Sequence, residues 1–249
     1  MIALISDIHS NTAALHAVLQ RIEELGADRI LCLGDVIGYG PDPRETLSVI
    51  MEVCELSIMG NHEHGALFYA SDFNPKARAA LDWTRDQLNN GDREAKMPLW
   101  KYLGDMQERY REEDFLLVHG SPRDPIKEYM IPRDGDDPDK LAGCFELFEG
   151  ASVAFVGHSH IPGVYPETGG YISPTECEGS YRINGTRALV NVGSVGQPRD
   201  GDPRASFVTY ETGEVRFHRV SYDIEATQRK ILAIPELPEY LAERLSRGR

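Results

Sequence analysis

The apolar run IALI at residues 2–5 passes through SDIHS into the helix-length segment NTAALHAVLQRIEELG at 11–26, and this stretch decides the expected fold. Apolar side chains recur in that segment at helical spacing. Ser10 or Asn11 is suited to cap the start of the helix, and Gly26 is suited to end it. The chain is therefore predicted to begin with a strand, a short polar loop and an amphipathic helix.

The same alternation continues through the first half of the chain. Further apolar runs stand at 29–33, 56–59, 115–119 and 153–157, and segments that read as helices follow at 43–54, 76–90 and 138–149. Continuous apolar runs that alternate with helices indicate a largely parallel sheet with helices on its face.

The pattern changes over residues 163–220, where short strand candidates are separated by Gly, Pro and Asn. This spacing favours antiparallel hairpins. Helices are predicted at 222–234 and 238–247, and the Pro- and Asp-rich stretch 121–140 is predicted to be an ordered loop over a site. We expect an α/β fold in a single domain, residues 1–249, with a mixed or double sheet and helices outside.

Composition and charge restrict the class of protein and of partner. The chain has 249 residues and a formal net charge of −14, and its longest apolar runs are far shorter than a membrane span. It opens without a signal-peptide pattern, so we expect a cytoplasmic protein without membrane contact. The acidic balance argues against a broad nucleic-acid-binding surface. A small phosphate-containing substrate remains compatible with it, because a bound metal can reverse the field inside one pocket.

Side chains that can bind metal follow each apolar run of the first half. Ligands of open parallel sheets bind beyond the carboxyl ends of the strands, so these side chains are expected to converge. Six of the eight histidines lie in these segments, and only His16 and His218 fall outside. The candidates are Asp7, His9, Asp35, Asn61, His62, His119, His158 and His160.

Imidazole and carboxylate together favour divalent Mn, Fe, Co or Zn. No cysteine is among the candidates, which argues against a structural zinc site. Even seven of these residues exceed what one tetrahedral ion needs, and seven suffice for two ions if one carboxylate bridges. Two ions about 3.5–4 Å apart can clamp a phosphoryl group, activate a water and stabilise the leaving oxygen.

At this point the sequence resembles the calcineurin-like metallophosphoesterase superfamily, and within it a small prokaryotic phosphodiesterase-like branch. The family pattern is DxH, GD, GNH[ED], a His after a hydrophobic strand, and GHxH. The corresponding blocks occur in the right order as SDIH (6–9), GDVIGYG (34–40), GNHEHG (60–65), VHG (118–120) and GHSH (157–160). The segment NVGSVGQPR (191–199) adds to the likeness to that branch.

The resemblance implies a four-layer α-β-β-α sandwich of two mixed sheets and a hydrolase of phosphate esters. It implies two divalent ions, expected to be Mn, with Fe, Zn, Ni or Co as alternatives. A metal-bridging hydroxide would attack the phosphorus, and His62 would protonate the leaving oxygen as general acid. The implied ligands are Asp7, His9 and His160 for one ion and Asn61, His119 and His158 for the other, with Asp35 as the bridge.

One departure from the family pattern bears on the substrate. Many members read GDxxDR in the second block, whereas this chain has Gly38 and Tyr39 in place of the last two residues. The change argues against protein phosphatase activity and leaves His62 without its usual carboxylate partner. Because Tyr39 carries no charge, and because Gly38 and Gly40 are expected to leave room for a second substituent, we expect phosphodiesters. A phosphomonoesterase and a non-catalytic scaffold of the same fold are the alternatives.

The sequence leaves several roles open. Asn11 can cap a helix or touch substrate, and His64 can lie at the surface or support a ligand by hydrogen bonding. His16 and His218 are expected to be structural. Any of three loop arginines can bind phosphate, namely Arg123, Arg133 and Arg199.

Overall fold

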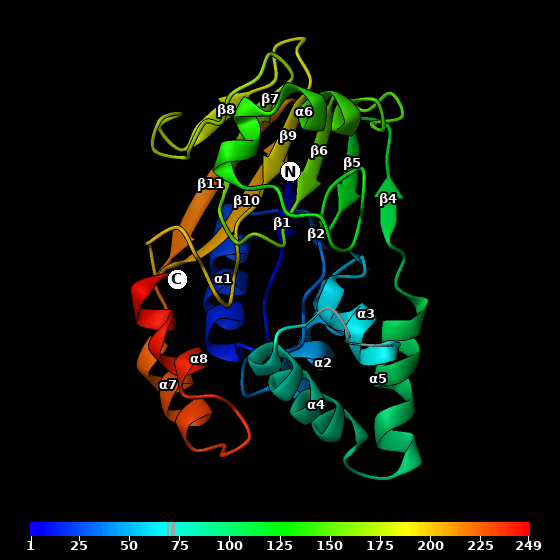
Figure 1. Cartoon of the computed structure of the whole chain (residues 1–249), viewed down its shortest axis with the longest axis vertical. Helices are drawn as coiled ribbons and strands as arrows, with labels where there is room; N and C mark the ends of the chain where they lie inside the picture. Colours follow the sequence, from blue (N-terminus) through cyan, green and yellow to red (C-terminus); the bar gives the residue numbers. More distant parts are fainter. Residues whose placement is uncertain (69, 71–72) are drawn as a thin grey trace.

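The computed structural model describes residues 1–68, 70 and 73–249, and its strands form two mixed sheets (Figure 1). The first sheet has the order β3–β2–β1–β10–β11–β8, with strands at Leu56–Ser57, Arg29–Cys32, Ile2–Ile5, Ala205–Glu211, Glu214–Val220 and Ser180–Arg182. The second has the order β4–β5–β6–β9–β7, with strands at Arg109–Arg111, Phe115–Val118, Val153–Val156, Ala188–Asn191 and Gly163–Pro166.

The helices lie between and after these strands. They are α1 (Thr12–Leu25), α2 (Pro43–Val53), α3 (Asn61–Leu67), α4 (Pro75–Asn89), α5 (Arg93–Asp105), α6 (Pro138–Phe145), α7 (Ile224–Leu232) and α8 (Tyr240–Glu243). Short 3₁₀ turns stand at Pro132–Asp136 and Leu245–Arg247. As predicted, Asn11 caps α1: its side chain accepts a hydrogen bond from the Ala14 amide, and Gly26 ends the helix in the left-handed conformation.

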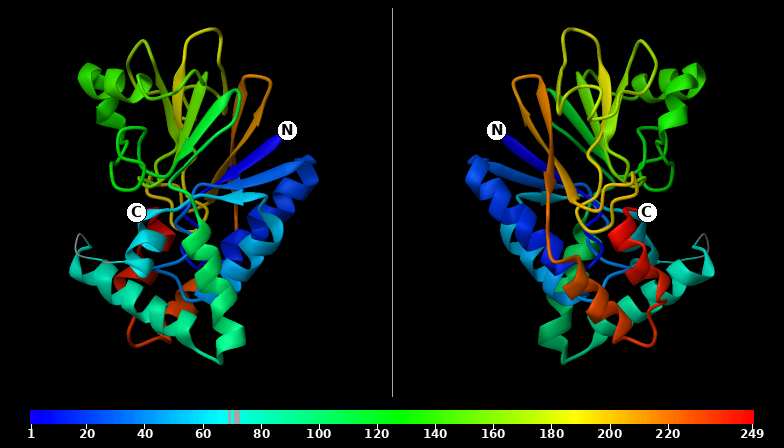
Figure 2. Two further views of the ribbon diagram at one scale, coloured as in Figure 1. Left: turned by 90° about the vertical axis from the view of Figure 1, so that its right-hand side faces the viewer. Right: turned by 90° about the vertical axis from the view of Figure 1, so that its left-hand side faces the viewer.

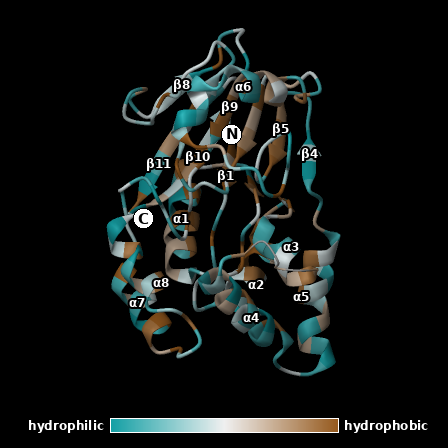
Figure 3. Ribbon diagram, in the orientation of Figure 1, coloured by the Kyte–Doolittle hydropathy of each residue, from teal (hydrophilic) through white to brown (hydrophobic). Residues whose placement is uncertain are grey.

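The two sheets lie between outer helices, which makes four layers (Figure 2). Side chains that alternate along the strands face these layers in turn. In β1, Leu4 points into the core between the sheets, whereas Ala3 and Ile5 pack with α1 and α2. In β5, Phe115 and Leu117 enter the core between the sheets, and the intervening Leu116 packs under α6. Each sheet thus has one face against the other sheet and one face against helices. The central strands, such as β5 and β9, are therefore hydrophobic, whereas the edge strands β4 and β8 are hydrophilic (Figure 3).

The structure confirms the α/β sandwich and corrects two expectations about its strands. The apolar runs of the first half do not share one sheet: β1, β2 and β3 belong to the first sheet, and β5 and β6 belong to the second. The region from 163 to 220 is not a series of hairpins either. Only β10 and β11 pair there as consecutive antiparallel strands among the described residues, and β9 runs parallel to β6. A run that is buried on both faces does not reveal which sheet it joins.

The predicted helices are confirmed as α1, α2, α4, α6 and α7, with α6 ending at Phe145 instead of residue 149. The segment at 238–247 forms the short α8 followed by a 3₁₀ turn. Two helices, α3 and α5, were not predicted, and α5 contains Pro98, which disfavours a helix interior. Within residues 1–68, 70 and 73–249, no helix has the length and hydropathy that crossing a membrane requires.

The packing between the sheets predicts the effect of removing a large side chain there. Phe155 is fully buried, and its ring lies 5.3 Å from that of Tyr210 of the opposite sheet. Phe155→Ala should lower the free energy of unfolding by about 3–5 kcal/mol, as measured by urea denaturation. The same substitution at Phe68, which is 62% exposed, should change it by less than about 0.5 kcal/mol. Equal effects at both positions would contradict the assigned core.

Candidate metal centre

Loops from both sheets bring the seven predicted ligands together. Asp7 and His9 follow β1, Asp35 follows β2, and Asn61 begins α3 after β3. The other three follow the second sheet's strands β5 and β6, namely His119, His158 and His160. All are buried except Asn61, which is half-buried. The convergence therefore occurs across two sheets that face each other, instead of along one sheet edge.

The ligand atoms form two groups. In the first, His160 Nε2 lies 3.0 Å from Asp7 Oδ1 and 3.1 Å from His9 Nε2. In the second, His119 Nε2 lies 3.2 Å from both His158 Nδ1 and Asn61 Oδ1. These groups match the two ligand sets that the resemblance implies, while the assignment of each residue to an ion stays a prediction.

Asp35 stands between the two groups. Its Oδ2 lies 3.3 Å from His119 Nε2 and 3.7 Å from His9 Nε2. Its other oxygen accepts a hydrogen bond of 2.9 Å from the amide of His62. The carboxylate is thus fixed by the backbone on one side and presents a single oxygen to both groups, which is the position that a bridging ligand requires.

Asp7 is held in the same way. Its Oδ2 accepts a hydrogen bond of 3.0 Å from the amide of His158. A Cβ at Gly157 would lie 2.5 Å from that same oxygen, and a Cβ at Gly60 would lie 2.2 Å from Oδ1 of Asp35. The glycines of the GHSH and GNH blocks are therefore needed because the two carboxylates pack directly against the backbone.

Each imidazole is oriented by a backbone carbonyl on its outer side. Three rings use Nδ1 as the outer nitrogen: His9 faces the carbonyl of Ile37, His119 that of Leu33, and His160 that of Gln197. His158 uses Nε2, which faces the carbonyl of Lys127. A nitrogen that faces a carbonyl carries the proton, so the inner nitrogen of a neutral ring carries a lone pair. This outer support fixes the tautomer in which an imidazole binds a metal.

The interior of the site is consequently rich in electron pairs and poor in protons. Asp7 Oδ1 is buried without a hydrogen-bond donor among the described residues. Burial would raise the pKa of Asp7, but His160 beside it keeps that pKa well below its usual range. Burial would lower the pKa of His119, but Asp35 and Asp7 raise it to about 9. A proton on His119 thus compensates part of the negative charge of the two carboxylates. Divalent cations would neutralise that charge fully, and they accept nitrogen and oxygen ligands of this kind.

The backbone of the site is strained. Five of the seven residues have positive φ angles, namely Asp7, His9, Asp35, His158 and His160, at 47–63°. Each such non-glycine residue costs on the order of 1–3 kcal/mol, and this kind of strain concentrates at functional sites. In a regular strand His158 and His160 would share one face. Here they reach different groups, because His160 contacts His9 and His158 contacts His119.

Glu63 is a supporting residue that the sequence reasoning missed. It is fully buried, and its carboxylate accepts hydrogen bonds from the amides of Asp35, Ile37 and Gly60. It therefore ties the loop after β2 to the loop after β3. The signal was present, because Glu63 occupies the acidic position of the GNH[ED] pattern.

His62 lies beside the two groups and is nearly fully buried. Its ring is 4.8 Å from that of His9, 4.4 Å from Tyr39 and 4.9 Å from Phe73. Its Nδ1 has no hydrogen-bond partner in the described part of the chain. Burial lowers the pKa of His62 to about 4, so the free ring is neutral at pH 7.

Two glycines that were expected to make room for substrate are tightly packed instead. A Cβ at Gly38 would lie 2.0 Å from His62 Nδ1, and a Cβ at Gly40 would lie 2.2 Å from the His9 carbonyl oxygen. The expected space for a substituent at Gly38 and Gly40 is therefore wrong. Their role is to let the loop after Asp35 lie against the histidines.

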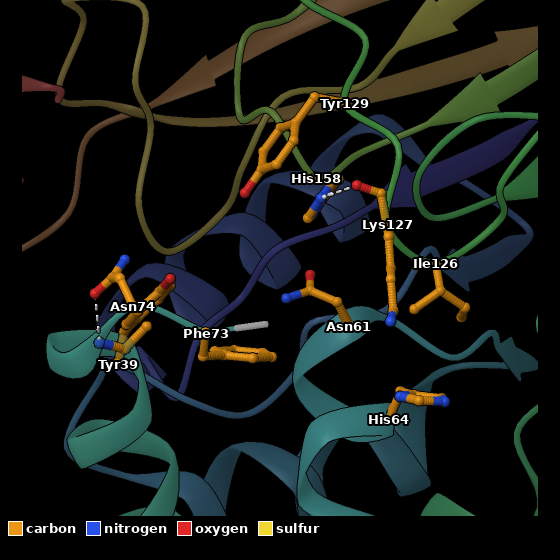
Figure 4. A pocket seen from close by; sticks show the side chains of 10 residues that line it. Tyr39, Asn61, His64, Phe73, Asn74, Ile126, Lys127, Tyr129 and His158 are labelled. Carbon is orange, nitrogen blue, oxygen red and sulfur yellow. Dashed lines mark hydrogen bonds between the residues drawn. The ribbon is translucent and has the colours of Figure 1, made fainter. Parts of the chain in front are cut away.

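A pocket of about 150 Å³ opens beside the second group (Figure 4). Asn61 and His158 reach it, whereas His62 does not line it. Its other walls include Tyr39, Phe73 and Tyr129. Tyr129 comes from the loop at 121–140 and stacks on His158 at 3.8 Å between ring centroids, so this loop does lie over the site.

The structure also separates the residues whose roles were open. Asn11 caps α1 and contacts Gly196 and Thr227, and Arg123 pairs with Glu128. His64 lines the pocket, and His218 stacks on Phe207 away from it. Of the three loop arginines, Arg199 adjoins the site: its guanidinium carbon lies 6.0 Å from the Tyr39 ring, and its amide donates to the His160 carbonyl.

Comparison with known proteins gives the family. Across all of its residues the chain is 38% identical to an uncharacterized protein of Methanocaldococcus jannaschii, of which 98% is covered. A metallophosphoesterase of Sphaerobacter thermophilus is 37% identical, with a TM-score of 0.83 over 100% of this chain and 98% of that one. A hypothetical protein of Pyrococcus horikoshii OT3 shares the fold, with a TM-score of 0.74 and 21% identity over 100% of this chain and 99% of that one.

The family model matches over most of the chain. It describes the calcineurin-like phosphoesterase superfamily domain and covers residues 1–214. Members of this family typically bind two divalent metal ions, and the grouped Asp and His side chains are suited to such a site. The match and the 37–38% identical relatives together show that the chain belongs to the calcineurin-like phosphoesterase superfamily.

Proposed function

We propose that this protein is a phosphoester hydrolase that prefers phosphodiesters and uses two divalent ions, with Mn as the expected metal. The observation that carries the proposal is the facing of carboxylate and imidazole donor atoms at 3.0–3.3 Å in two groups joined by Asp35. A non-catalytic scaffold would have no need for this complete set of donors.

Asp7, His9 and His160 would hold one ion, Asn61, His119 and His158 would hold the other, and Asp35 would contact both. When bound, the ions would supply Lewis-acid stabilisation of the phosphoryl oxygens and a nucleophile derived from water. The chain itself contributes the orientation of each donor, through the backbone carbonyls behind the imidazoles and the amides that fix the carboxylates.

The bridging position of Asp35 predicts the metal content. Elemental analysis of the Mn-loaded protein should give close to two ions per chain, and Asp35→Asn should lower this number because the neutral amide attracts cations less. Asp28→Asn, an exposed change of the same kind, should leave it unaffected. A content of one ion that Asp35→Asn does not alter would contradict the bridge.

We propose His62 as the proton donor to the leaving oxygen. A proton donor works best with a pKa near the working pH. An anionic phosphate group beside the ring would therefore have to offset the effect of burial on the pKa of His62. Because Tyr39 and Phe73 separate the ring from the pocket, access also requires one of these two side chains to move.

The leaving group distinguishes this role from a merely structural one. His62→Ala should lower kcat by about 10²–10⁴ for a diester that loses an alkoxide, the usual range for general acid catalysis. The loss should be much smaller for one that loses p-nitrophenolate, which departs without protonation. His16→Ala, on the exposed face of α1, serves as the control. Equal losses with both leaving groups and unchanged metal content would instead make His62 a positioning residue.

The preference for diesters is supported by the pocket and by Tyr39. Tyr39, Phe73 and Tyr129 provide an aromatic wall for an organic substituent next to Asn61 and His158. Tyr39 provides no charge at the position where other family members keep an Arg for a phosphate dianion. The uncharged wall therefore suits the second ester group better than a free phosphate oxygen.

The ratio of two chromogenic substrates tests this preference. With Mn at one pH, kcat/KM should be higher for bis(p-nitrophenyl) phosphate than for p-nitrophenyl phosphate. A ratio well below one would support a phosphomonoesterase, and no turnover of either compound with two ions bound would support a scaffold. Exchange of Gly38 for Asp is not a usable test, because the added side chain would collide with His62.

A further inference from the structure

The last segment of the chain, residues 222–249, packs against the first group of ligands. It contains α7 and α8, and α7 lies next to α1 (Figure 1). The family model ends at residue 214, so membership of the family gives this segment no role. A cavity of about 10 Å³ is lined by Thr227 and Ile231 of the segment and by His9 and Gln197 of the site. A cavity of this volume holds at most about one water molecule, so the segment and the first group are almost in direct contact.

Asn11 connects this segment to the site. Its side chain is buried, and Oδ1 accepts hydrogen bonds from the Ala14 amide at 3.2 Å and from the Thr227 hydroxyl at 2.9 Å. Its Nδ2 donates to the Gly196 carbonyl at 2.9 Å and to the Tyr222 hydroxyl at 3.3 Å. A backbone amide can only donate and a carbonyl can only accept, so Ala14 and Gly196 fix the orientation of the Asn11 amide. Capping of α1 uses only the first of these four bonds.

The loop that contains Gly196 supports two ligands of the first group. The Gly196 amide donates to the Asp7 carbonyl at 3.0 Å, and a Cβ at Gly196 would lie 1.8 Å from the carbonyl oxygen of Ile8. The next residue, Gln197, faces Nδ1 of His160 with its carbonyl at 2.6 Å. The hydrogen bond that the Gly196 carbonyl accepts is thus one residue from the group that orients His160. A shift of this loop would displace the His160 ring relative to Asp7.

The second group of ligands is supported by other parts of the chain. The carbonyls that face its imidazoles belong to Leu33 for His119 and to Lys127 for His158. Leu33 follows β2, and Lys127 lies in the loop at 121–140. A change in the segment 222–249 should therefore act on the first group and leave the second group largely as it is.

We propose that Asn11 and Thr227 are positioning residues for the ion of the first group. The Thr227 hydroxyl holds the Asn11 amide, and this amide holds the Gly196 carbonyl and thereby the loop that orients His160. The inference rests on the two-ion site of the proposed function and adds that the C-terminal segment controls the affinity for one ion and not for the other. Removal of a group that orients a metal ligand commonly weakens metal binding by about 10- to 100-fold.

Two single-site backgrounds separate the ions without any catalysis. His158→Ala removes a ligand of the second group and His160→Ala removes one of the first, so calorimetry should detect about one Mn²⁺ in each. In the His158→Ala protein, Thr227→Val should weaken Mn²⁺ binding by about 3- to 10-fold, the range expected for one lost hydrogen bond. In the His160→Ala protein, the same substitution should have little effect. Equal weakening in both backgrounds, or none in the His158→Ala protein, would overturn the proposal.

Matched substitutions distinguish positioning from a general loss of stability. Thr46→Val makes the same change at a buried threonine of α2 whose Oγ1 has no hydrogen-bond partner among the residues that the structure describes, and it should leave Mn²⁺ binding unaltered. Thr227→Ser keeps the hydroxyl and should retain the affinity. Asn11→Asp keeps the cap of α1 but turns a carboxylate oxygen toward the Gly196 carbonyl, and it should weaken the first ion by about tenfold or more. The added negative charge alone would strengthen cation binding, so it cannot account for a loss.

The metal-free protein tests the same contact in the absence of ions. With a chelator present, the Gln197 carbonyl should protect the Nδ1 proton of His160 from exchange with water, and NMR measures the rate of that exchange. Asn11→Asp should raise the rate by about tenfold or more, because the loop that holds the carbonyl opens more often. The Nδ1 proton of His119, which faces Leu33, should exchange as in the unmodified chain. If a single-site background binds no ion, this exchange rate alone decides.

The two measurements separate the failure of each claim. Two bound ions whose affinities do not respond to Thr227→Val, with unchanged exchange at His160, would overturn the positioning role and leave the proposed hydrolase intact. No Mn²⁺ binding by the unmodified chain, combined with exchange at His160 that depends on Asn11, would overturn the two-ion site and retain the positioning role. A melting temperature close to that of the unmodified chain serves as the folding control for each variant.

Discussion

The structure depends on one electrostatic constraint. Nitrogen and oxygen atoms with lone pairs, from five loops, face one another at the centre, and too few protons lie between them to join every pair by a hydrogen bond. His9 and His160 approach through inner nitrogens at 3.1 Å, and His119 and His158 do so at 3.2 Å. The outer nitrogen of each ring already faces a backbone carbonyl, so a simple change of tautomer would not relieve this arrangement. Positive charge has to be supplied from outside the chain.

The fold holds these donors in place against their mutual repulsion. The two sheets pack through an apolar core that includes Phe115, Phe155 and Tyr210, and this core fixes the loop ends relative to one another. The loops pay for the convergence with left-handed backbone at five ligand positions. The amides of His62 and His158 and the carboxylate of Glu63 then lock the carboxylates and the loops. The orientation of the donors thus comes from the fold of the chain itself.

The sequence was informative where chemistry follows directly from residue order. Polar residues placed straight after apolar runs predicted the ligand set, because a strand that ends at a core must turn its next residues toward the same edge. The apolar runs alone did not reveal which of the two implied sheets each strand joins, since runs buried on both faces have no polar side to compare. It also gave Gly38 the wrong role, because the contact with His62 joins residues that only the folded backbone brings together. The selection of Arg199 over Arg123 and Arg133 likewise required the tertiary structure.

The central claim is that the groups joined by Asp35 would hold two divalent ions, with Asp35 contacting both. Electron paramagnetic resonance of the protein loaded with two equivalents of Mn²⁺ tests this most directly, because ions about 3.5–4 Å apart interact magnetically. The account predicts the spectrum of an exchange-coupled pair, which Asp35→Asn weakens or abolishes. A spectrum of isolated Mn²⁺ at every loading, unaffected by that substitution, would contradict it.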